Sequence, residues 1–288
     1  MNILSGILSR KISPSWEYTT NGTLWKLLPA PGGLLLGEVR DTSAKNCSFF
    51  CLEERTGETK WHGLTFNEQW WIGIERVHRD TIFFHEFARP DLPSPRKIFA
   101  VNLSTGTVRW SNDELQFLFA HEDSVYASKD TFESRVFFEL DLLSGTILRE
   151  LEDGANYLNV LRETVHSTAD ELVEFPESVK IQSIAEHFPH MKLTRHIVFG
   201  RIIGDVETVE HNGVLTIGYY ENTSPNPYEV EMKHRLSMFD IEKGNLLFHD
   251  TLAEKLKTPA PDLFFRRSDC LFYIKGRSTI KAIAVPQS

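Results

Sequence analysis

Short apolar runs, separated by turns of glycine, asparagine and charged residues, recur along the chain. Trp71-Ile-Gly-Ile and Thr81-Ile-Phe-Phe flank the turn Arg79-Asp80, for example, and two similar runs flank Asn212-Gly213. Runs of this length bounded by such turns predict β-strands joined as hairpins. Three further hairpins have turns at Gly32-Gly33, Glu122-Asp123 and Ser268-Asp269, and a weaker one runs from Tyr157 to His166. The six turns begin at residues 32, 79, 122, 162, 212 and 268, so successive turns are 40 to 56 residues apart.

A second unit follows four of these hairpins, and its best copy is Ala100-x-Asn102-x-x-Thr105-Gly106-x-x-x-Trp110. The segments 51–61, 139–149 and 238–248 align with it without gaps and end in Trp61, Arg149 and Phe248. In each copy an apolar strand enters a short turn, where Asn or Asp can bond the backbone and glycine can take a positive φ. The next strand carries a large side chain four residues after the glycine, which is suited to packing against a neighbouring sheet.

Together the two units give four strands per repeat, at a period typical of β-propeller blades. We therefore predict an all-β protein with one domain over residues 1–288, a β-propeller of about six four-stranded blades, with five or seven also compatible. The last repeat has only three strands, whereas Ser15-Trp16-Glu17-Tyr18 is a strand without a repeat of its own. We expect this N-terminal strand to pair with the outer edge of the last blade and to close the ring.

One stretch departs from the strand pattern. Residues 177–190 have a composition compatible with a helix, and Ile181, Ile184 and Phe188 would lie on its apolar face. We expect a short helical insertion there, followed by a strand near His196-Ile-Val-Phe.

The Thr-Gly-x-x-x-Trp units, above all Ala100 to Trp110, resemble the blades of the quinoprotein-type (PQQ-like) β-propeller repeats. The resemblance covers about four of the predicted repeats and implies the blade architecture, in which each tryptophan docks against the next blade. Asn102 stands where these repeats usually have aspartate. The resemblance does not extend to the quinone site, because the sequence has no adjacent cysteine pair and less length than eight blades need. Quinone and calcium are therefore not expected.

Composition narrows the classes of partner. The chain of 288 residues is 41% hydrophobic and 25% charged, with a net charge of −9 and a sequence pI near 5.7. An acidic balance argues against nucleic acid and anionic membranes as partners, because both require Lys and Arg to neutralise phosphates. No apolar stretch reaches the length of a membrane span, and the first residues do not read as a signal peptide. Three cysteines do not suggest a disulfide framework, so we expect a cytoplasmic protein.

Candidate chemistry is sparse. The densest histidine group, His187, His190 and His196, has no Cys or acidic residue completing a zinc motif, and a solvated insertion explains it better. Cys47 and Cys51 fit the role of small buried apolar residues. Neither nucleophile motifs nor phosphate loops occur, so we expect no catalytic, cofactor or metal residues. Charged residues near the ends of the predicted inner strands could ring a channel mouth: Arg76, His78, His121, Arg162, His211, Arg266 and Arg267.

Two hypotheses about function follow. The first is a non-enzymatic interaction module that binds a protein or peptide, and the second is a small-molecule binder or enzyme with its site at the channel mouth. Loops beyond about 12 residues are uncommon unless they are functional or disordered. The predicted long connections, 86–97, 221–235 and 249–261, fall on one side of the ring, opposite the tight turns. We therefore expect the partner to contact this long-loop face near Phe87, Arg89 and Tyr228.

Overall fold

The computed structural model describes residues 12–89, 92–152, 154–166, 173–191, 193–226, 229–259 and 264–285. The chain forms two compact units. Unit 1 consists of residues 1–19 and 172–288, and unit 2 consists of residues 20–171. Most of the described residues lie in strands, so the all-β class is confirmed, with α1 and α2 as the helical exceptions. Within the described ranges neither helix has the length and apolar content needed to cross a bilayer.

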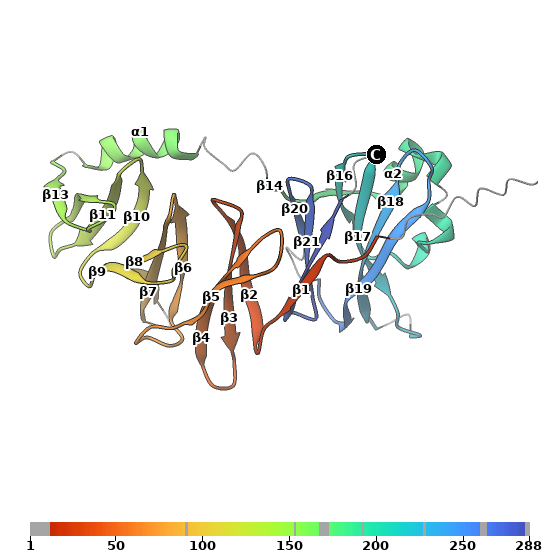
Figure 1. Ribbon diagram of the computed structural model, residues 1–288, viewed down its shortest axis with the longest axis horizontal. Helices are drawn as coiled ribbons and strands as arrows, with labels where there is room; N and C mark the ends of the chain where they lie inside the picture. Colours follow the sequence, from red (N-terminus) through yellow and green to blue (C-terminus); the bar gives the residue numbers. More distant parts are fainter. Residues whose placement is uncertain are drawn as a thin grey trace, which may run out of the picture. The chain divides into compact units, whose positions relative to one another are not determined.

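Unit 2 contains three antiparallel meanders of four strands each, coloured from red-orange to green in Figure 1. A parallel strand pair, with Gln116 opposite Lys97, joins the second and third meanders into one eight-stranded sheet. The first is β2 (Thr23–Ala30), β3 (Leu34–Asp41), β4 (Asn46–Glu53) and β5 (Thr59–Leu64). The second is β6 (Ile72–His78), β7 (Thr81–Arg89), β8 (Leu92–Asn102) and β9 (Val108–Asn112). The third is β10 (Gln116–His121), β11 (Ser124–Asp130), β12 (Arg135–Asp141) and β13 (Ile147–Glu150), followed by α1 (Gly154–His166).

Unit 1 contains two further meanders, each with one short strand added at its first edge. The fourth meander is β16 (Val206–His211), β17 (Val214–Asn222), β18 (Met232–Asp240) and β19 (Leu246–Leu256), with β15 (Glu177–Val179) added to β16. The fifth is β20 (Phe264–Arg267), β21 (Cys270–Lys275), β22 (Thr279–Ala284) and β1 (Trp16–Thr19), with β14 (Val173–Glu174) added to β20.

The predicted Thr-Gly turns form as the sequence indicates. In the second meander, Asn102 Oδ1 accepts hydrogen bonds from the backbone N–H groups of Ser104 and Thr105, both at 3.0 Å. Gly106 takes a φ of 69°, in the left-handed region that favours glycine. The tryptophan of the preceding meander, Trp61, donates its indole N–H to the carbonyl of Leu103 at 2.7 Å. The prediction that the residue four positions past the glycine packs against a neighbouring sheet is therefore confirmed for this repeat.

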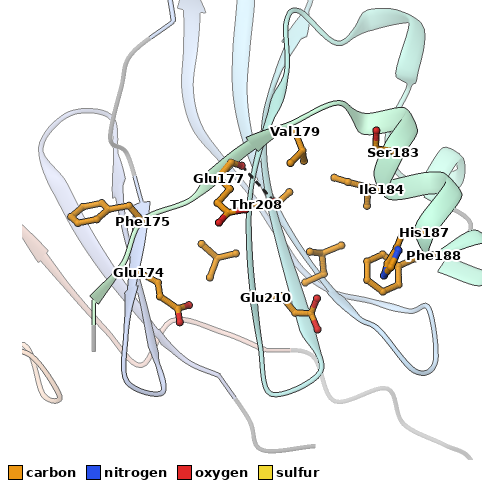
Figure 2. A pocket seen from close by; sticks show the side chains of 12 residues that line it. Glu174, Phe175, Glu177, Val179, Ser183, Ile184, His187, Phe188, Thr208 and Glu210 are labelled. Carbon is orange, nitrogen blue, oxygen red and sulfur yellow. Dashed lines mark hydrogen bonds between the residues drawn. The ribbon is translucent and has the colours of Figure 1, made fainter. Parts of the chain in front are cut away.

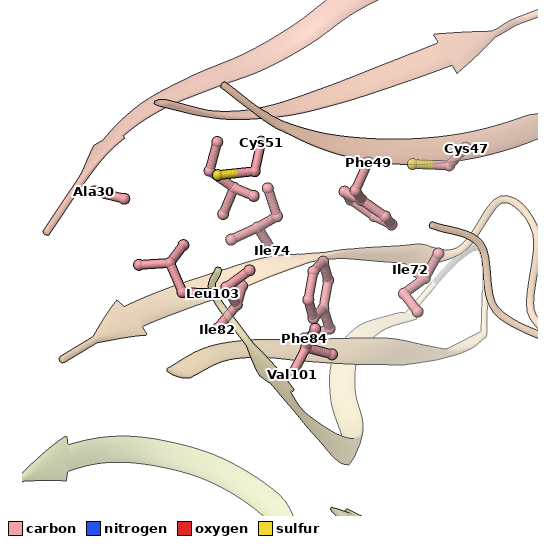
Figure 3. Packing of buried hydrophobic residues seen from close by; sticks show 11 residues of the cluster. Ala30, Cys47, Phe49, Cys51, Ile72, Ile74, Ile82, Phe84, Val101 and Leu103 are labelled. Atoms are coloured by element: carbon pink, nitrogen blue, oxygen red, sulfur yellow. The ribbon is translucent and has the colours of Figure 1, made fainter. Parts of the chain in front are cut away.

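The core of unit 2 lies between successive meanders. Figure 3 shows the cluster between the first two, where the rings of Phe49 and Phe84 meet edge to face with centroids 4.7 Å apart. Cys47 and Cys51 point into the same cluster from β4 and are buried. The prediction that these two cysteines serve as small apolar core residues is confirmed. Strand β4 begins at Asn46, early enough for both side chains to share one face.

The N-terminal strand lies where the sequence places it. Strand β1 pairs antiparallel with β22 in a register that puts Trp16 opposite Ala282 and Tyr18 opposite Ile280. The indole of Trp16 lies 6.0 Å from the ring of Phe272. This pairing supplies the fourth strand of the last meander. The closure of a ring, the number of blades and a single domain over residues 1–288 stay predictions.

Three local predictions need correction. The weak hairpin between Tyr157 and His166 is the helix α1, in which Leu158 is buried beside Phe119 and Tyr126. No strand forms near His196. The chain there passes through the 3₁₀ turns η2 (Leu193–Arg195) and η3 (Phe199–Arg201). Residues 177–190 hold the predicted helix as α2 (Ile181–His187), with Ile181 and Ile184 buried, but they begin with strand β15.

The repeat changes between the third and fourth meanders. Arg149 stands where Trp61 and Trp110 stand, and its guanidinium pairs with Glu139 at 2.7 Å. In the fourth meander, Gly244 has the turn position, but the backbone of the 3₁₀ turn η1 (Pro189–Met191) already covers it. A Cβ on Gly244 would lie 2.9 Å from the carbonyl oxygen of His190. Arg149 and Gly244 therefore make other contacts than the tryptophan–glycine contact that Trp61 makes.

Candidate functional site

The predicted partner residues fall into three cases. Phe87 is described and half-buried in β7, where its backbone N–H donates to the carbonyl of Trp71 at 2.9 Å. Arg89 ends β7 opposite Leu92, but its side chain lies outside the described residues, as does all of Tyr228. The structure therefore places one of the three side chains.

The predicted long connections are shorter than expected. Residues 86–97 form the end of β7 and the beginning of β8, with Phe87 opposite Pro95 in the register. Strand β17 extends to Asn222 and β18 begins at Met232, and β19 runs to Leu256 through the predicted third loop. Ladder hydrogen bonds extend the hairpins where the sequence, with its prolines, suggested irregular loops. Most of the predicted loop length is therefore strand.

Trp70 and Trp71 immediately precede β6, and the backbone of Trp71 bonds that of Phe87. The backbone N–H groups of Trp70 and Trp71 both donate to one carboxylate oxygen of Glu68, each at 2.9 Å. Burial opposes ionisation of Glu68, but these two backbone N–H groups, with neighbouring positive charges, hold its pKa below the usual range. The side chain of Trp71 remains 36% exposed. The connection between β5 and β6 is thus tied into a fixed shape that presents Trp71 to solvent.

Arg40, at the end of β3, fixes Trp70 from the other side. Its Nη1 donates to the carbonyl of Trp70 and its Nη2 to the carbonyl of Ile72, both at 2.9 Å, while Nε donates to Glu38 at 2.7 Å. Glu38 is buried, so the ion pair is largely removed from water. The planar guanidinium makes these bonds from three different nitrogens at fixed angles, a geometry that the single nitrogen of a lysine cannot reproduce.

The Arg40 guanidinium also contacts two indole rings. Its central carbon lies 5.2 Å from the ring centre of Trp25 and 5.0 Å from that of Trp70. The ammonium of Lys45 lies 4.7 Å from the ring centre of Trp70. Trp25 keeps 61% of its surface exposed. We call Trp25, Arg40, Lys45, Trp70 and Trp71 the tryptophan cluster.

The tryptophan cluster forms because its members sit at one end of the first meander. Register pairs Thr23 with Arg40, at the start of β2 and the end of β3, and Asp41 with Asn46 across the turn that holds Lys45. Sequence reasoning did not select Trp25, Arg40, Lys45 or Trp70. A usable signal was present, because Trp70-Trp71 places two large apolar residues in a polar connection. The cluster lies on the end of the meander opposite the Gly32-Gly33 and Thr56-Gly57 turns.

A second candidate is a hollow of about 730 Å³ in unit 1. Figure 2 shows it between the β14–β15 segment, strand β16 and helix α2. Its lining comprises Glu174, Phe175, Glu177, Val179, Ser183, Ile184, His187, Phe188, Thr208, Val209, Glu210 and Leu215. Pairing of β14 with β20 and of β15 with β16 fixes one wall, and the buried Ile181 and Ile184 fix the helix.

Several of the charges predicted for a channel mouth are already paired. Arg266 is buried and donates Nε–H to Glu174 at 2.8 Å, which holds the pKa of Glu174 below its usual range. His211 contacts Asp269 at 2.8 Å. In unit 2, His78 bonds the carbonyl of Glu122 at 2.9 Å. Within unit 1, Arg266 and His211 both act on Glu174, which lines the hollow, and Arg267 lies opposite Val173 in the adjoining pair of β14 with β20.

The histidines of the insertion do not converge. His190 contacts the carbonyl of Ile241, and His196 lies beside the ring of Phe239, 5.9 Å between centroids. Across the described ranges, no group of three His, Cys, Asp or Glu side chains is placed to hold a metal ion.

One serine–histidine pair occurs on the fourth meander. Ser237 Oγ lies 3.0 Å from His249 Nδ1, an arrangement that can activate a nucleophile. The other ring nitrogen, Nε2, faces Arg235 Nη1 at 3.3 Å, and arginine can only donate. In the neutral ring, Nε2 must then accept, so Nδ1 carries the proton and donates to Ser237. This tautomer cannot take a proton from the serine, which is also buried.

One protein-family model matches part of the chain, and the role of that family is not described. A family model described as a domain of unknown function (DUF4905) matches residues 30–110. The matched segment contains Arg40, Lys45, Trp70, Trp71 and Phe87. No curated protein matches the chain.

Solved structures with some likeness include two β-propeller domains. One is from the Trilobed protease of Pyrococcus furiosus, with 10% identity and a TM-score of 0.32 over 89% of this chain and 64% of that one. The other is the Cps50 (Swd1) domain of Myceliophteria thermophila, with 9% identity and a TM-score of 0.34 over 94% and 100%. An uncharacterized Listeria monocytogenes protein has 8% identity and a TM-score of 0.33 over 93% and 97%. TM-scores below 0.5 carry no inference about this chain.

Proposed function

We propose that this chain is a β-propeller interaction module that binds a protein or peptide through the tryptophan cluster and the adjacent Phe87. The observation that carries the proposal is the exposure of Trp25 beside a buried Arg40 that donates three hydrogen bonds. Large aromatic side chains that remain exposed on a fixed support are typical of binding surfaces. This surface lies at the end of the first meander that is opposite the tight turns. The long connections were predicted on that same side.

Preorganisation supports the same proposal. Arg40 holds the connection of Trp70 and Trp71 through two backbone carbonyls, and Glu68 holds it through two backbone N–H groups. A partner that contacts this surface therefore loses little chain entropy on the side of this protein. A tryptophan side chain adds large contact area with only two rotatable bonds.

The proposed ring consists of five meanders, closed where β1 pairs with β22. The proposed location is the cytoplasm, supported by three cysteines that form no disulfide. The proposed action is binding without catalysis, since the serine–histidine pair has the wrong tautomer for proton transfer.

The test uses a peptide library displayed on phage and selected on the purified full chain. We expect selected peptides to bind with micromolar affinity, and the double variant Trp25→Ala/Trp71→Ala to weaken them at least about tenfold. Phe132→Ala is the matched control, because Phe132 is an exposed aromatic residue of the same unit outside the tryptophan cluster. Melting curves should coincide for all variants. Peptides that bind the double variant as tightly as the wild type would place the binding surface elsewhere.

A further inference from the structure

We propose that the hollow in unit 1 binds an ammonium or guanidinium group carried on an apolar stem. The lining of this site belongs to unit 1, whereas the tryptophan cluster belongs to unit 2, so the proposal does not rest on peptide binding by the cluster. The chemistry could come from a free organic amine or from a lysine or arginine side chain.

The shape and lining of the hollow fit the apolar stem. Its volume of about 730 Å³ lies within the range of small-molecule sites, about 300–1,000 Å³. Val179, Ile184, Val209 and Leu215 line it from four different elements, β15, α2, β16 and β17. Figure 2 shows Ile184 and Phe188 of the α2 side lying beside the strand that carries Thr208 and Glu210. An alkyl stem entering here removes its own apolar surface from water against walls that are largely buried already.

The charge of the lining selects a cation. Of its three carboxylates, Glu174 is neutralised by the buried Arg266. Glu177 and Glu210 are exposed, and the described part of the chain shows no basic partner for either. Arg266 is therefore occupied, and two carboxylates of the lining remain to face a ligand. These two carboxylates repel an anion and attract a cation.

The walls need no rearrangement to accept a ligand. Strand β15 is held on β16 with Glu177 opposite Thr208, and Thr208 Oγ1 donates to the Glu177 carbonyl at 3.5 Å. Helix α2 is fixed by the burial of Ile184 in the cluster that also contains Leu215. Glu177 and Glu210 are therefore carried on paired strands, where both carboxylates can reach one cationic group.

The experiment is isothermal titration calorimetry of the full chain at low ionic strength with four probes. Butylammonium and agmatine are the free cations, the blocked tripeptide Gly-Lys-Gly supplies a side-chain ammonium, and butyrate is the matched anion. We expect saturable binding of the cations at millimolar concentration, loss of binding as salt is added, and no binding of butyrate. Tighter binding of the peptide than of butylammonium assigns the site to a peptide side chain, and the reverse assigns it to a free amine.

Isosteric variants locate the site. Glu177→Gln and Glu210→Gln should each weaken the cation roughly threefold to fivefold, the range for partly exposed charge pairs. Glu242→Gln, an exposed glutamate of the same unit outside the lining, should leave binding unchanged. Equal affinity in Glu177→Gln, Glu210→Gln and the wild type would overturn the proposal, as would butyrate binding or the absence of any saturable heat. Trp25→Ala should have no effect, which separates this site from the proposed peptide surface.

Discussion

The indole of Trp61 lies directly on Gly106 of the following meander. A Cβ at Gly106 would be 2.7 Å from Cδ2 of the ring, closer than real Cβ contacts come. Trp110 repeats the relationship on Gly145 and donates its N–H to the carbonyl of Leu142 at 3.0 Å. Each meander of unit 2 is therefore fastened to the next by a tryptophan that fits only over glycine.

This contact predicts unequal costs for two alanine substitutions. Gly63 has a φ of 74° and Gly106 a φ of 69°, so both variants carry left-handed backbone strain of roughly 1–2 kcal/mol. A Cβ at Gly63 meets nothing within 4 Å, whereas one at Gly106 meets Trp61. We expect Gly106→Ala to lower the free energy of unfolding by about 1–3 kcal/mol more than Gly63→Ala, measured by urea denaturation. Equal losses would show that Trp61 moves aside freely.

Removing the Arg40 guanidinium should leave the buried Glu38 without its cationic partner. Arg40→Met is expected to cost about 3–5 kcal/mol of unfolding free energy at neutral pH, because Glu38 is only 2% exposed. The double variant Glu38→Gln/Arg40→Met should recover part of this loss. Arg149→Met, which breaks a pair whose arginine is 58% exposed, is the control and should cost under about 1 kcal/mol. A cost for Arg40→Met no larger than the control would contradict the role of the buried pair.

His234 should make the protein lose stability in mild acid. The side chain is buried against Tyr220, 4.3 Å between ring centres, and neither ring nitrogen has a hydrogen-bond partner among the residues that the structure describes. Burial lowers the pKa of His234 to about 4, from an ordinary value of 6.5. The unfolded chain therefore binds the proton first, and stability falls as pH drops from about 7 towards 4, by about 3 kcal/mol from this residue.

His234→Phe tests this pH dependence, because it keeps the stacking on Tyr220 and removes the titration. Urea denaturation between pH 7 and pH 4 should show a shallower decline of stability for this variant. His62→Gln changes an exposed histidine and should leave the decline unchanged. A wild-type slope retained in His234→Phe would assign the acid sensitivity to other groups.

The core thiols should be inert in the native protein. Burial raises the pKa of Cys47 to about 12, with the nearby Glu38 adding to it, and burial likewise raises the pKa of Cys51 to about 12. Since the thiolate is the reactive form, Ellman's reagent at pH 8 should modify at most one thiol per native chain, that of Cys270. All three should react in urea. Two reactive thiols under native conditions would contradict the burial of β4.

The strands were predictable because their signals are local. The unit from Ala100 to Trp110 contains its strand, its turn asparagine, its glycine and its docking tryptophan within eleven residues. The hairpin predicted from Tyr157 to His166 was wrong because it rested on local signals alone. Its apolar residues Leu158 and Leu161 are compatible with a helical face as well as with a strand, and contact with Phe119 and Tyr126 decides for the helix.

The tryptophan cluster could not be assembled from the sequence. Arg40 and Trp70 are 30 residues apart, on β3 of the first meander and just before β6 of the second, and the packing of these two meanders brings the guanidinium to the carbonyl that it bonds. The hollow depends on the same kind of distant contact, since Glu174 meets Arg266 92 residues away. Residues this far apart in the sequence show which chemistry is available, but the pairing and packing of the strands decide which groups meet.

The pairing of β1 with β22 sets the order in which the protein can fold during synthesis. Thr19 and Thr279, whose hydroxyl oxygens lie 3.1 Å apart, are separated by 260 residues. A ribosome adds roughly 5–20 residues per second, so β1 waits on the order of tens of seconds for its partner strand. Meanwhile every described strand pair of residues 20–171 lies within that segment, which can fold first. Strand β1 is synthesised before every other described strand and is paired last, so a chaperone that holds β1 would delay only the fifth meander.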